Sequence, residues 1–278
     1  MIAFLGTGLL GSGFARALRR RGEQVTVWNR TASRARPLEA DGIAVRDDVA
    51  GAVRGAARIH LSLSDDAAVD DTLERAGVAP GQVIVDHTTT SVAGTRARAA
   101  RWAERGIEFL HAPVFMGPQN ALDATGTMLA SGDRARYDRL APELAKMTGK
   151  LVYLGEAPER AAGFKLTGNL FLMFVTTGMI EMIAFARAVG IAPADAVTLF
   201  ESFNPGTTLQ ARAKRILDAA YDKPSWELAM ARKDARLMLD DAGAAVHILP
   251  AIAAEMDRWI ARGHGHDDWT VMASDAVR

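Results

Sequence analysis

The chain has 278 residues, 49% of them hydrophobic and 24% charged, which is typical of a globular protein with one large or two smaller domains and excludes extended disorder. Its 33 lysines and arginines balance 33 aspartates and glutamates, so the overall charge favours neither nucleic acid nor an anionic membrane as a partner. The sequence has no cysteine, which excludes disulfides and thiolate chemistry, and it shows no signal-peptide pattern; we expect a cytoplasmic protein.

The first half of the chain alternates short apolar runs with segments of helical periodicity. The apolar runs predict strands at residues 1–6, 24–29, 58–64, 82–88 and 107–114. Between them, helices are predicted at residues 9–22, 65–77 and 91–106, with a short helix or turn at residues 32–42. This alternation predicts a parallel sheet wrapped by helices, and the runs at residues 126–133 and 150–155 are expected to close that sheet.

After about Glu159 the strand patterns stop and only helical segments follow. We therefore expect an α/β domain at residues 1–159 and an all-α domain at residues 160–278. The apolar segment from Leu166 to Ala186 is nearly long enough to cross a bilayer, but it contains Asn169 and Glu181 and no second such segment exists. We interpret it as a helix buried in a soluble protein or in its oligomer, not as a membrane span.

The segment "FLGTGLLGSG" places Gly6, Gly8 and Gly11 in the G-x-G-x-x-G spacing, directly after a predicted strand and at the start of a predicted helix. Glycine lets the backbone approach a pyrophosphate, and the N-terminus of the following helix attracts the anion. A glycine-rich turn that only eases strand–helix packing is the alternative. The context favours dinucleotide binding by this loop, including Thr7, Leu9 and Leu10.

The residues that follow the second predicted strand indicate which dinucleotide is bound. An acidic residue there would accept hydrogen bonds from the ribose of NAD, whereas this chain has Asn29, Arg30 and Thr31. The guanidinium of Arg30 can form a charge-assisted fork with the 2′-phosphate of NADP, and Arg34 or Arg36 can add charge. The alternative is a solvated loop arginine. The sequence predicts NADP(H) as the cofactor.

With the glycine loop, "WNRT", "DHTTT", "HAPV" and "GFKLTGN" in this order, the whole chain resembles the β-hydroxyacid dehydrogenase family, of the 3-hydroxyisobutyrate dehydrogenase and glyoxylate/succinic semialdehyde reductase type. The resemblance implies an α/β Rossmann domain, an all-α C-terminal domain reached through a long interdomain helix, and a homodimer or homotetramer. It also implies hydride transfer between a nicotinamide and the carbonyl or alcohol carbon of a small β-hydroxy acid or semialdehyde.

The resemblance assigns roles to individual residues. The catalytic lysine and its partner asparagine fall on Lys165 and Asn169, whose spacing of four places them on one helix face. An end-of-helix charge is the alternative for Lys165. The resemblance further implies that Leu63, Ser64 and Thr89 contact the cofactor. It places Lys233 near the nicotinamide with Asp234 as support, although a solvated charged pair would give the same pattern.

The chain departs from the family where the substrate is expected. Members that act on small hydroxy acids read D-A-P-V-S-G-G, and their serine and glycine groups bind the substrate carboxylate. Here His111 replaces the acid, Phe115 replaces the serine and Met116 replaces the first glycine, so that only Gly117 remains. We expect Phe115, Met116 and Gly117 to line a less polar substrate site, because a hydroxyl donor has been exchanged for an aromatic ring.

Two other functions stay open. The same architecture occurs in imine reductases, which act on C=N bonds, although they generally lack a lysine at the position of Lys165. A non-catalytic protein that binds NADP as a sensor or scaffold is the third possibility. No metal site is expected, because the histidines show no metal-ligand spacing and "HGH" at residues 264–266 lies in a glycine-rich turn.

Overall fold

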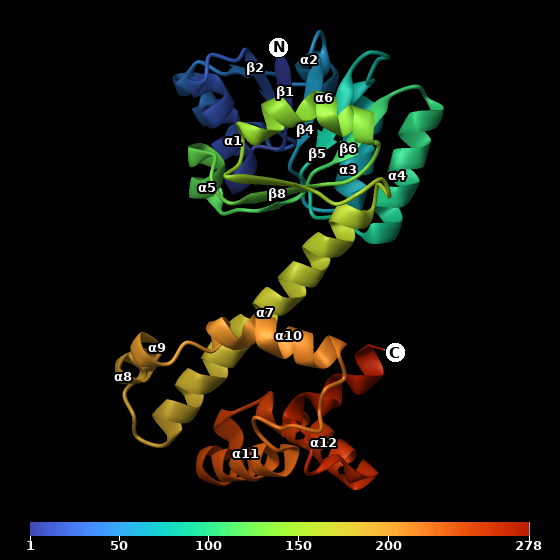
Figure 1. The fold of residues 1–278 in the computed structure, drawn as a ribbon. Coiled ribbons are helices and arrows are strands. Elements are labelled where there is room, and N and C mark those ends of the chain that lie inside the picture. Colours follow the sequence, from blue (N-terminus) through green and yellow to red (C-terminus); the bar gives the residue numbers. More distant parts are fainter. Residues whose placement is uncertain (278) are drawn as a thin grey trace. The chain divides into compact units, whose positions relative to one another are not determined.

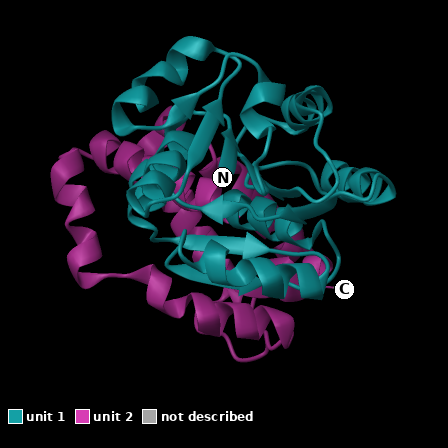
Figure 2. Cartoon of the chain, turned by 90° about the horizontal axis from the view of Figure 1, so that it is seen from above, with its two compact units in different colours: residues 1–170 teal, residues 171–278 magenta. Residues whose placement is uncertain are grey.

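The computed structural model describes residues 1–277, which form two compact units (Figures 1 and 2). Unit 1 comprises Met1–Leu170 and unit 2 comprises Phe171–Arg278. The division falls inside one long helix, α7 (Arg160–Ala188), whose first residue coincides with the start of the second domain that the sequence suggests.

The main sheet of unit 1 has six parallel strands in the order β3-β2-β1-β4-β5-β6, and Figure 1 shows β1, β4, β5 and β6 side by side. Its strands are β1 (Ile2–Leu5), β2 (Val25–Trp28), β3 (Ala44–Val45), β4 (Arg58–Leu61), β5 (Val83–Asp86) and β6 (Glu108–His111). In register, Leu5 lies opposite both Trp28 and Leu61, so the strands end at one common edge. The chain order reverses between β1 and β4, which is where such sheets bind ligands. The predicted Rossmann fold is confirmed.

The α-helices that begin in unit 1 follow its strands along the chain, and the last of them continues into unit 2. They are α1 (Leu9–Arg20), α2 (Val49–Val53), α3 (Asp66–Ala76), α4 (Val92–Glu104), α5 (Pro118–Asp123), α6 (Arg134–Ala145) and α7. Side-chain caps fix several of their starts: Asp65 accepts a hydrogen bond from the Ala68 amide at 2.8 Å, and Ser91 accepts one from the Gly94 amide at 3.0 Å. The predicted short helix at residues 32–42 forms the 3-10 helices η1 (Ala32–Arg34) and η2 (Arg36–Asp41).

The core lies on both faces of the sheet, because alternate residues of a strand point to opposite sides. In β1, Phe4 packs with Phe14 of α1 in one buried cluster, whereas Leu5 packs with Ile59 and Trp102 in another. A parallel strand covered on both faces is apolar along most of its length, which explains why the four residues of β1 are all hydrophobic and buried.

Two strand predictions need correction. Residues 126–133 and 150–155 do not close the main sheet; they form β8 (Thr127–Ala130) and β9 (Lys150–Tyr153), which pair with β7 (Val114–Phe115) in a second, three-stranded sheet. One bridge between His111 and Ser131 connects the two sheets. The run at residues 107–114 is not one strand, because Pro113 has no N–H to donate and the chain turns there from β6 into β7.

Unit 2 contains the rest of α7 and a set of shorter helices. These are α8 (Pro193–Val197), α9 (Leu199–Ser202), α10 (Leu209–Leu217), α11 (Leu228–Ala242) and α12 (Leu249–Trp259), with 3-10 helices η3 (Pro205–Thr208), η4 (Gly243–Ala245) and η6 (Trp269–Ala276) and a π-helical turn, η5 (Ile260–His264). Residues of α11 and α12, among them Leu228, Met256 and Trp259, form its core. The all-α character predicted for this part of the chain agrees with these elements.

Glu181 is a polar residue in the apolar part of α7, and its carboxylate has a defined role within unit 2. It accepts hydrogen bonds from the backbone amides of His247, Ile248 and Leu249 at 2.7, 3.0 and 3.1 Å. These amides precede and begin α12, so the carboxylate satisfies donors that have no partner inside that helix and complements its dipole.

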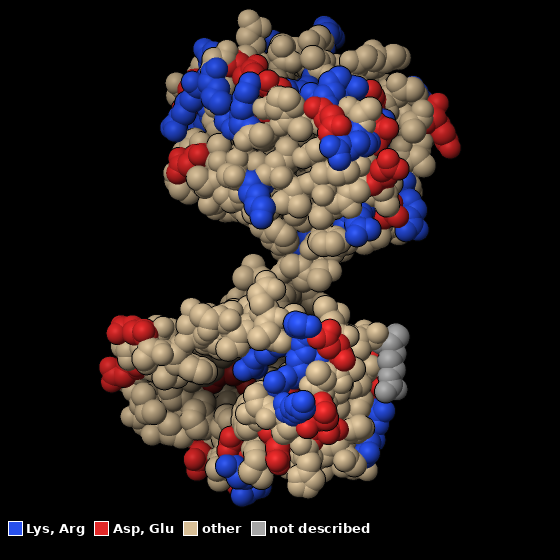
Figure 3. All heavy atoms as spheres, viewed as in Figure 1, with Lys and Arg blue, Asp and Glu red and all other residues tan. Residues whose placement is uncertain are grey.

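Among residues 1–277, α7 is the one helix with the length and hydropathy to cross a membrane, and only 6% of its most apolar window is buried by the chain itself. A single copy therefore does not cover this helix, so its predicted burial in an oligomer stays a prediction. Figure 3 shows lysines and arginines mixed with aspartates and glutamates on the visible face of both units. This mixing fits the balance of 33 basic and 33 acidic residues.

Candidate active site

The glycine loop connects β1 to α1 at the common edge of the sheet. Gly6 has a φ of +94°, and a Cβ atom there would lie 2.2 Å from the Ser62 carbonyl oxygen. A Cβ atom on Gly11 would lie 2.0 Å from the Gly6 carbonyl oxygen. Gly8, by contrast, would meet nothing within 4 Å. The first and third glycines therefore serve the tight turn and the packing, and the second leaves the backbone open to an approaching ligand.

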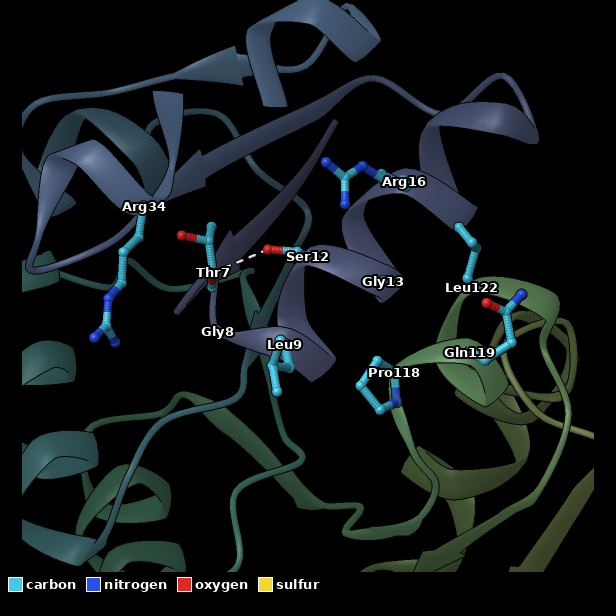
Figure 4. A pocket seen from close by; sticks show the side chains of 10 residues that line it. All are labelled: Thr7, Gly8, Leu9, Ser12, Gly13, Arg16, Arg34, Pro118, Gln119 and Leu122. Carbon is cyan, nitrogen blue, oxygen red and sulfur yellow. Dashed lines mark hydrogen bonds between the residues drawn. The ribbon is translucent and has the colours of Figure 1, made fainter. Parts of the chain in front are cut away.

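The start of α1 has the features of an anion-binding site. Gly8 is the N-cap residue, and no side chain caps the first amides of the helix. Those amides have no partner inside the helix, and the helix dipole adds partial positive charge there. From the first turn of α1, the Ser12 hydroxyl donates to the Thr7 carbonyl at 3.0 Å and shapes the loop, as Figure 4 shows.

Asn29 connects the end of β2 to this loop. Its Oδ1 accepts a hydrogen bond from the Thr7 amide at 3.0 Å, and its Nδ2 donates to the Thr31 carbonyl at 2.9 Å. The Asn29 side chain is thus engaged in holding the loop and the turn after β2 together. Arg30 and Arg34 form no salt bridge among residues 1–277, whereas Arg36 pairs with Glu39 and Asp47. Of the three arginines, Arg36 is therefore the one that is already engaged by two carboxylates.

A cleft of about 290 Å³ brings most of the predicted cofactor residues together. Its lining includes Gly6, Gly8, Leu9, Leu10, Asn29, Arg30, Thr31, Arg34, Leu63 and Ser64. Five further lining residues were not expected from the sequence: Trp28, Ser62, Ala68, Asp71 and Thr72. The last three lie on α3, and their spacings of three and four place them on one helix face. This helical spacing is visible in the sequence.

Leu63 and Ser64 reach the cleft because the ends of β4 and β5 are held together. The Leu63 amide donates to Thr88 Oγ1 at 3.0 Å, and the Thr88 amide donates to Asp86 Oδ1 at 2.9 Å. Thr89 is the next residue along and is exposed, but it does not line the cleft. Its predicted contact with the nicotinamide stays a prediction.

A second hollow, of about 650 Å³, lies on the other side of the glycine loop, between α1 and α5 (Figure 4). It shares Gly8, Leu9 and Arg34 with the cleft, and it adds Thr7, Ser12, Gly13, Arg16, Pro118, Gln119 and Leu122. Figure 4 shows the Arg34 and Arg16 side chains on opposite sides of the loop. This hollow was not expected from the sequence, because α1 and α5 are about 100 residues apart and only tertiary packing brings them together.

Lys165 and Asn169 lie in the part of α7 that belongs to unit 1. Lys165 Nζ donates a hydrogen bond to Asn169 Oδ1 at 2.9 Å, as the spacing of four allows. The Lys165 residue is only 9% exposed. Burial lowers the pKa of this amine from its usual value, because removal from water disfavours the charged form. A solvated end-of-helix lysine would not have these surroundings.

The predicted substrate residues surround this lysine only in part. The ring of Phe115, at the end of β7, lies with its centroid 4.2 Å from Lys165 Nζ. Met116 instead packs against the hydrophobic core of unit 1. The Gly117 amide donates to Asn120 Oδ1 at 2.9 Å, at the start of α5. The one glycine retained from the family pattern therefore has its amide engaged inside the loop.

Lys233 lies on α11 in unit 2, where its Nζ is 2.7 Å from Asp234 Oδ1. The pair is partly exposed, and its proposed place beside the nicotinamide stays a prediction. Among residues 1–277, no group of three or more histidine, aspartate or glutamate side chains is arranged to hold a metal ion. In the "HGH" turn, His264 pairs with Asp267 and His266 with Glu227, at 2.7 and 3.4 Å.

A six-stranded parallel sheet that reverses its order at β1 and β4, with a glycine loop at that point, defines a dinucleotide-binding protein of the α/β class. Residues 1–155 match the family model of the NAD binding domain of 6-phosphogluconate dehydrogenase. The chain belongs to this family. The predicted resemblance to the β-hydroxyacid dehydrogenases is confirmed with it.

Curated relatives match over nearly the whole chain. Glyoxylate/succinic semialdehyde reductase 2 of Arabidopsis thaliana is 28% identical over 274 residues, which cover 96% of this chain and 76% of the reductase. The cytokine-like nuclear factor N-PAC of Homo sapiens is 29% identical over 262 residues, 91% of this chain. The matched region covers only 46% of N-PAC, so this chain spans less than half of that protein.

Solved structures share the fold over the full length. An imine reductase of Streptomyces aurantiacus superposes with a TM-score of 0.88 and 28% identity, covering 100% of this chain and 99% of that one. A reductive aminase of Aspergillus terreus, solved with NADPH4, cyclohexanone and allyl amine, has a TM-score of 0.91 at 23% identity, with 100% and 99% covered. At that identity the second likeness concerns the fold alone.

Proposed function

We propose that the protein is an NADP-dependent oxidoreductase in which Lys165 acts as the general acid and base. One observation carries this proposal: Lys165 is buried in the same unit as the dinucleotide loop, and its Nζ is hydrogen-bonded to Asn169 and covered by Phe115. An amine whose pKa is lowered by burial releases its proton more readily than a solvated lysine does.

The residues present fit NADP(H). The position of Gly8 leaves open space at the N-terminus of α1, where a pyrophosphate would be held by backbone amides. Arg30, Arg34 and Thr31 line the same cleft beyond β2, where a 2′-phosphate would be bound. When bound, the reduced cofactor supplies a hydride to the substrate carbon. The crystallised imine reductase of Myxococcus stipitatus with NADP+, a protein of the same fold, is compatible with this choice.

Lys165 would complete the reduction of a carbonyl group. As the carbon gains the hydride, the C=O electron pair moves to the oxygen, and a proton from the Lys165 ammonium neutralises the developing alkoxide to give the alcohol. In the reverse direction the neutral amine accepts the hydroxyl proton. Asn169 Oδ1 holds one N–H of the ammonium, which limits the orientations of the side chain.

The relative from Arabidopsis supports a small β-hydroxy acid or semialdehyde as the substrate class, since its name describes a glyoxylate and succinic semialdehyde reductase. The alternative is a C=N substrate, supported by the imine reductase of Streptomyces aurantiacus and by the aromatic ring of Phe115 beside Lys165. A non-catalytic NADP-binding protein is the third proposal. Lys165 favours the carbonyl reaction, because an alkoxide needs a proton donor.

A panel assay separates these proposals. The protein is incubated with NADPH and with small aldehydes, keto acids and cyclic imines, and nicotinamide absorbance is followed. Oxidation of NADPH with the aldehydes or keto acids supports carbonyl reduction, oxidation with cyclic imines alone supports the alternative, and silence on the whole panel supports the non-catalytic proposal.

The role of Lys165 is tested on the best substrate. Lys165→Ala is expected to lower turnover by about 10²–10⁴-fold with little change in NADPH affinity, which is the usual contribution of a general acid. Lys165→Arg should be almost as slow, because a guanidinium does not readily release a proton. Lys150→Ala, which removes an exposed lysine of β9 in the same unit, is the matched control. Near-normal turnover in Lys165→Ala would refute the proposed role.

A further inference from the structure

The ring of Phe115 and the amine of Lys165 come from distant parts of the chain but meet within unit 1. Lys165 Nζ lies over the face of the ring, 4.2 Å from its centroid. An ammonium in this position is attracted by the negative face of the aromatic quadrupole. The ring therefore contacts the reactive group of the proposed acid and base directly, although it has no acid–base chemistry of its own.

A glycine of α7 makes room for this ring. A Cβ atom on Gly168 would lie 2.3 Å from Phe115 Cζ and 2.8 Å from Cε1, so any side chain at position 168 would displace the ring. Lys165, Gly168 and Asn169 are spaced by three and four residues and therefore share one face of α7. That face carries the Lys165 amine, the glycine against which the Phe115 ring packs, and the Asn169 amide that accepts a hydrogen bond from the amine.

The contacts of the ammonium leave it little freedom. One N–H of Lys165 donates to Asn169 Oδ1. The ring of Phe115 contacts the same Nζ atom as a second partner. A lysine side chain has several rotatable bonds, and it loses much conformational entropy when it is fixed. Two separate contacts on one Nζ atom reduce that entropy before the substrate arrives, which favours a productive geometry.

We infer that Phe115, seated on Gly168, is a positioning residue that holds the Lys165 ammonium in the orientation required for proton transfer. This inference rests on the proposed function, because it assigns Phe115 to the same site. It differs from a substrate-lining role, in which the ring would act on the substrate and not through the lysine.

A double-mutant cycle separates the two roles. Phe115→Leu keeps an apolar side chain but removes the aromatic face, and we expect turnover to fall by about 2- to 30-fold, the range that a lost cation–π contact gives. In a Lys165→Ala background the same substitution should have no further effect on turnover, since Phe115 then has nothing to position. An equal loss in both backgrounds would overturn the inference.

The pH profile provides a second readout. In Phe115→Leu the substituted aliphatic side chain would still exclude water from Nζ, but it would no longer stabilise the ammonium, so the pKa of Lys165 should fall further in this variant. The rate of carbonyl reduction, which needs the protonated lysine, should then decline at lower pH than in the wild type. If turnover changes but the rate still declines at the wild-type pH, Phe115 has only a structural role, which contradicts the inference.

Gly168→Ala displaces the ring without changing it. We expect the same loss of turnover, the same dependence on Lys165 and unchanged NADPH affinity. Gly163→Ala, five residues earlier in the same helix, is the matched control, because its Cβ would meet only Val92 Cγ2 at an ordinary 3.8 Å. Circular dichroism and NADPH titration confirm that each variant is folded. Wild-type turnover in folded Gly168→Ala would show that packing of the Phe115 ring against Gly168 is not needed to position Lys165.

The experiments distinguish the proposed function from the positioning role. If Lys165→Ala keeps near-normal turnover, the proposed function fails. If Lys165→Ala is slow but the effects of Phe115→Leu and Lys165→Ala are additive, the proposed function stands and only the positioning role of Phe115 fails.

Discussion

The three glycines of the loop after β1 have different surroundings, although they belong to one motif. Gly11 packs against the Gly6 carbonyl oxygen, which a Cβ atom would approach to 2.0 Å, whereas a Cβ atom on Gly8 would meet nothing within 4 Å. A methyl group at position 11 must therefore shift the backbone, and one at position 8 would extend into the space proposed for the pyrophosphate. The same substitution should have two different consequences.

We expect Gly11→Ala to lower the free energy of unfolding by about 1–3 kcal/mol, as overpacking does. Gly8→Ala should unfold at nearly the wild-type denaturant concentration but bind NADPH about 10- to 100-fold more weakly, because amides that would bind the phosphates are obstructed. Urea titration and fluorescence titration measure the two effects. Normal NADPH affinity in Gly8→Ala would contradict the assignment of this loop.

The arginines after β2 also differ in their surroundings. Arg36 is engaged by Glu39 and Asp47, whereas Arg30 and Arg34 form no such salt bridge among residues 1–277. We expect the wild type to bind NADPH more tightly than NADH, and Arg30→Ala to lose about 10- to 100-fold in NADPH affinity, the contribution of one charge-assisted contact. NADH affinity should change little in this variant.

Arg36→Ala is the matched control for this prediction, because its guanidinium is already neutralised by two carboxylates. Dissociation constants for both dinucleotides are measured in all three proteins. Equal affinities of the wild type for NADPH and NADH would show that Arg30 does not select the phosphate.

At the scale of elements, β4 and the end of β5 carry a buried pair of histidines. His87 Nδ1 lies 2.7 Å from the Ala112 carbonyl oxygen and must donate to it, so His87 Nε2 accepts from His60 Nδ1 at 2.9 Å. His87 is thereby neutral, because its accepting Nε2 carries no proton. Burial lowers the pKa of His87 to about 4 and also lowers the pKa of His60.

This pair predicts loss of stability in mild acid. In the unfolded chain both histidines bind protons below their ordinary pKa of about 6.5, while in the folded protein they stay neutral. The two neutral histidines therefore make their full contribution to the free energy of unfolding above that pH. This contribution is lost as the pH falls from about 6.5 toward 4. For His87 alone the loss is on the order of 3 kcal/mol.

Urea unfolding at pH 7.5 and at pH 4.5 measures this loss. His87→Phe removes the titrating group and should reduce the difference between the two pH values, whatever its effect on stability at pH 7.5. His266→Ala, which removes an exposed histidine, should leave the difference unchanged. If the His87 variant shows the full wild-type pH dependence, the loss comes from other groups.

At the scale of the whole molecule, α7 exposes a large apolar surface that we expect a second protein chain to cover. Leu172, Met173 and Phe174 are 59%, 65% and 63% exposed in the single chain, and a contiguous apolar surface of this kind usually marks an association site. We propose a homodimer or homotetramer that covers it. Light scattering at micromolar concentration is expected to give at least twice the mass of the chain, 29.8 kDa.

Met173→Asp should shift this equilibrium toward the monomer, because a charge in an apolar interface has no partner. Lys150→Asp, on an exposed strand of unit 1, should not shift it. A wild type that stays monomeric at these concentrations would contradict the proposal.

Much of the site follows from local patterns. The glycine spacing, Arg30 in place of an acid, and Lys165 with Asn169 one helical turn later are recognisable in the sequence, because turn geometry, phosphate chemistry and helical periodicity act over a few residues. Continuous apolar runs predicted the buried parallel strands in the same way. The cofactor-loop residues, the Rossmann domain and the helical second part of the chain were accessible at this level.

Only the tertiary structure decided which distant segments meet. Residues 126–133 and 150–155 were recognisable as strands, but their membership of a second sheet depends on pairing with β7 and on the turn at Pro113. The contact of Phe115 with Lys165 joins residues 50 positions apart, and it depends on the missing side chain of Gly168. Local propensity and spacing carry no information about such pairs, because their contacts depend on how whole faces of helices and sheets pack together.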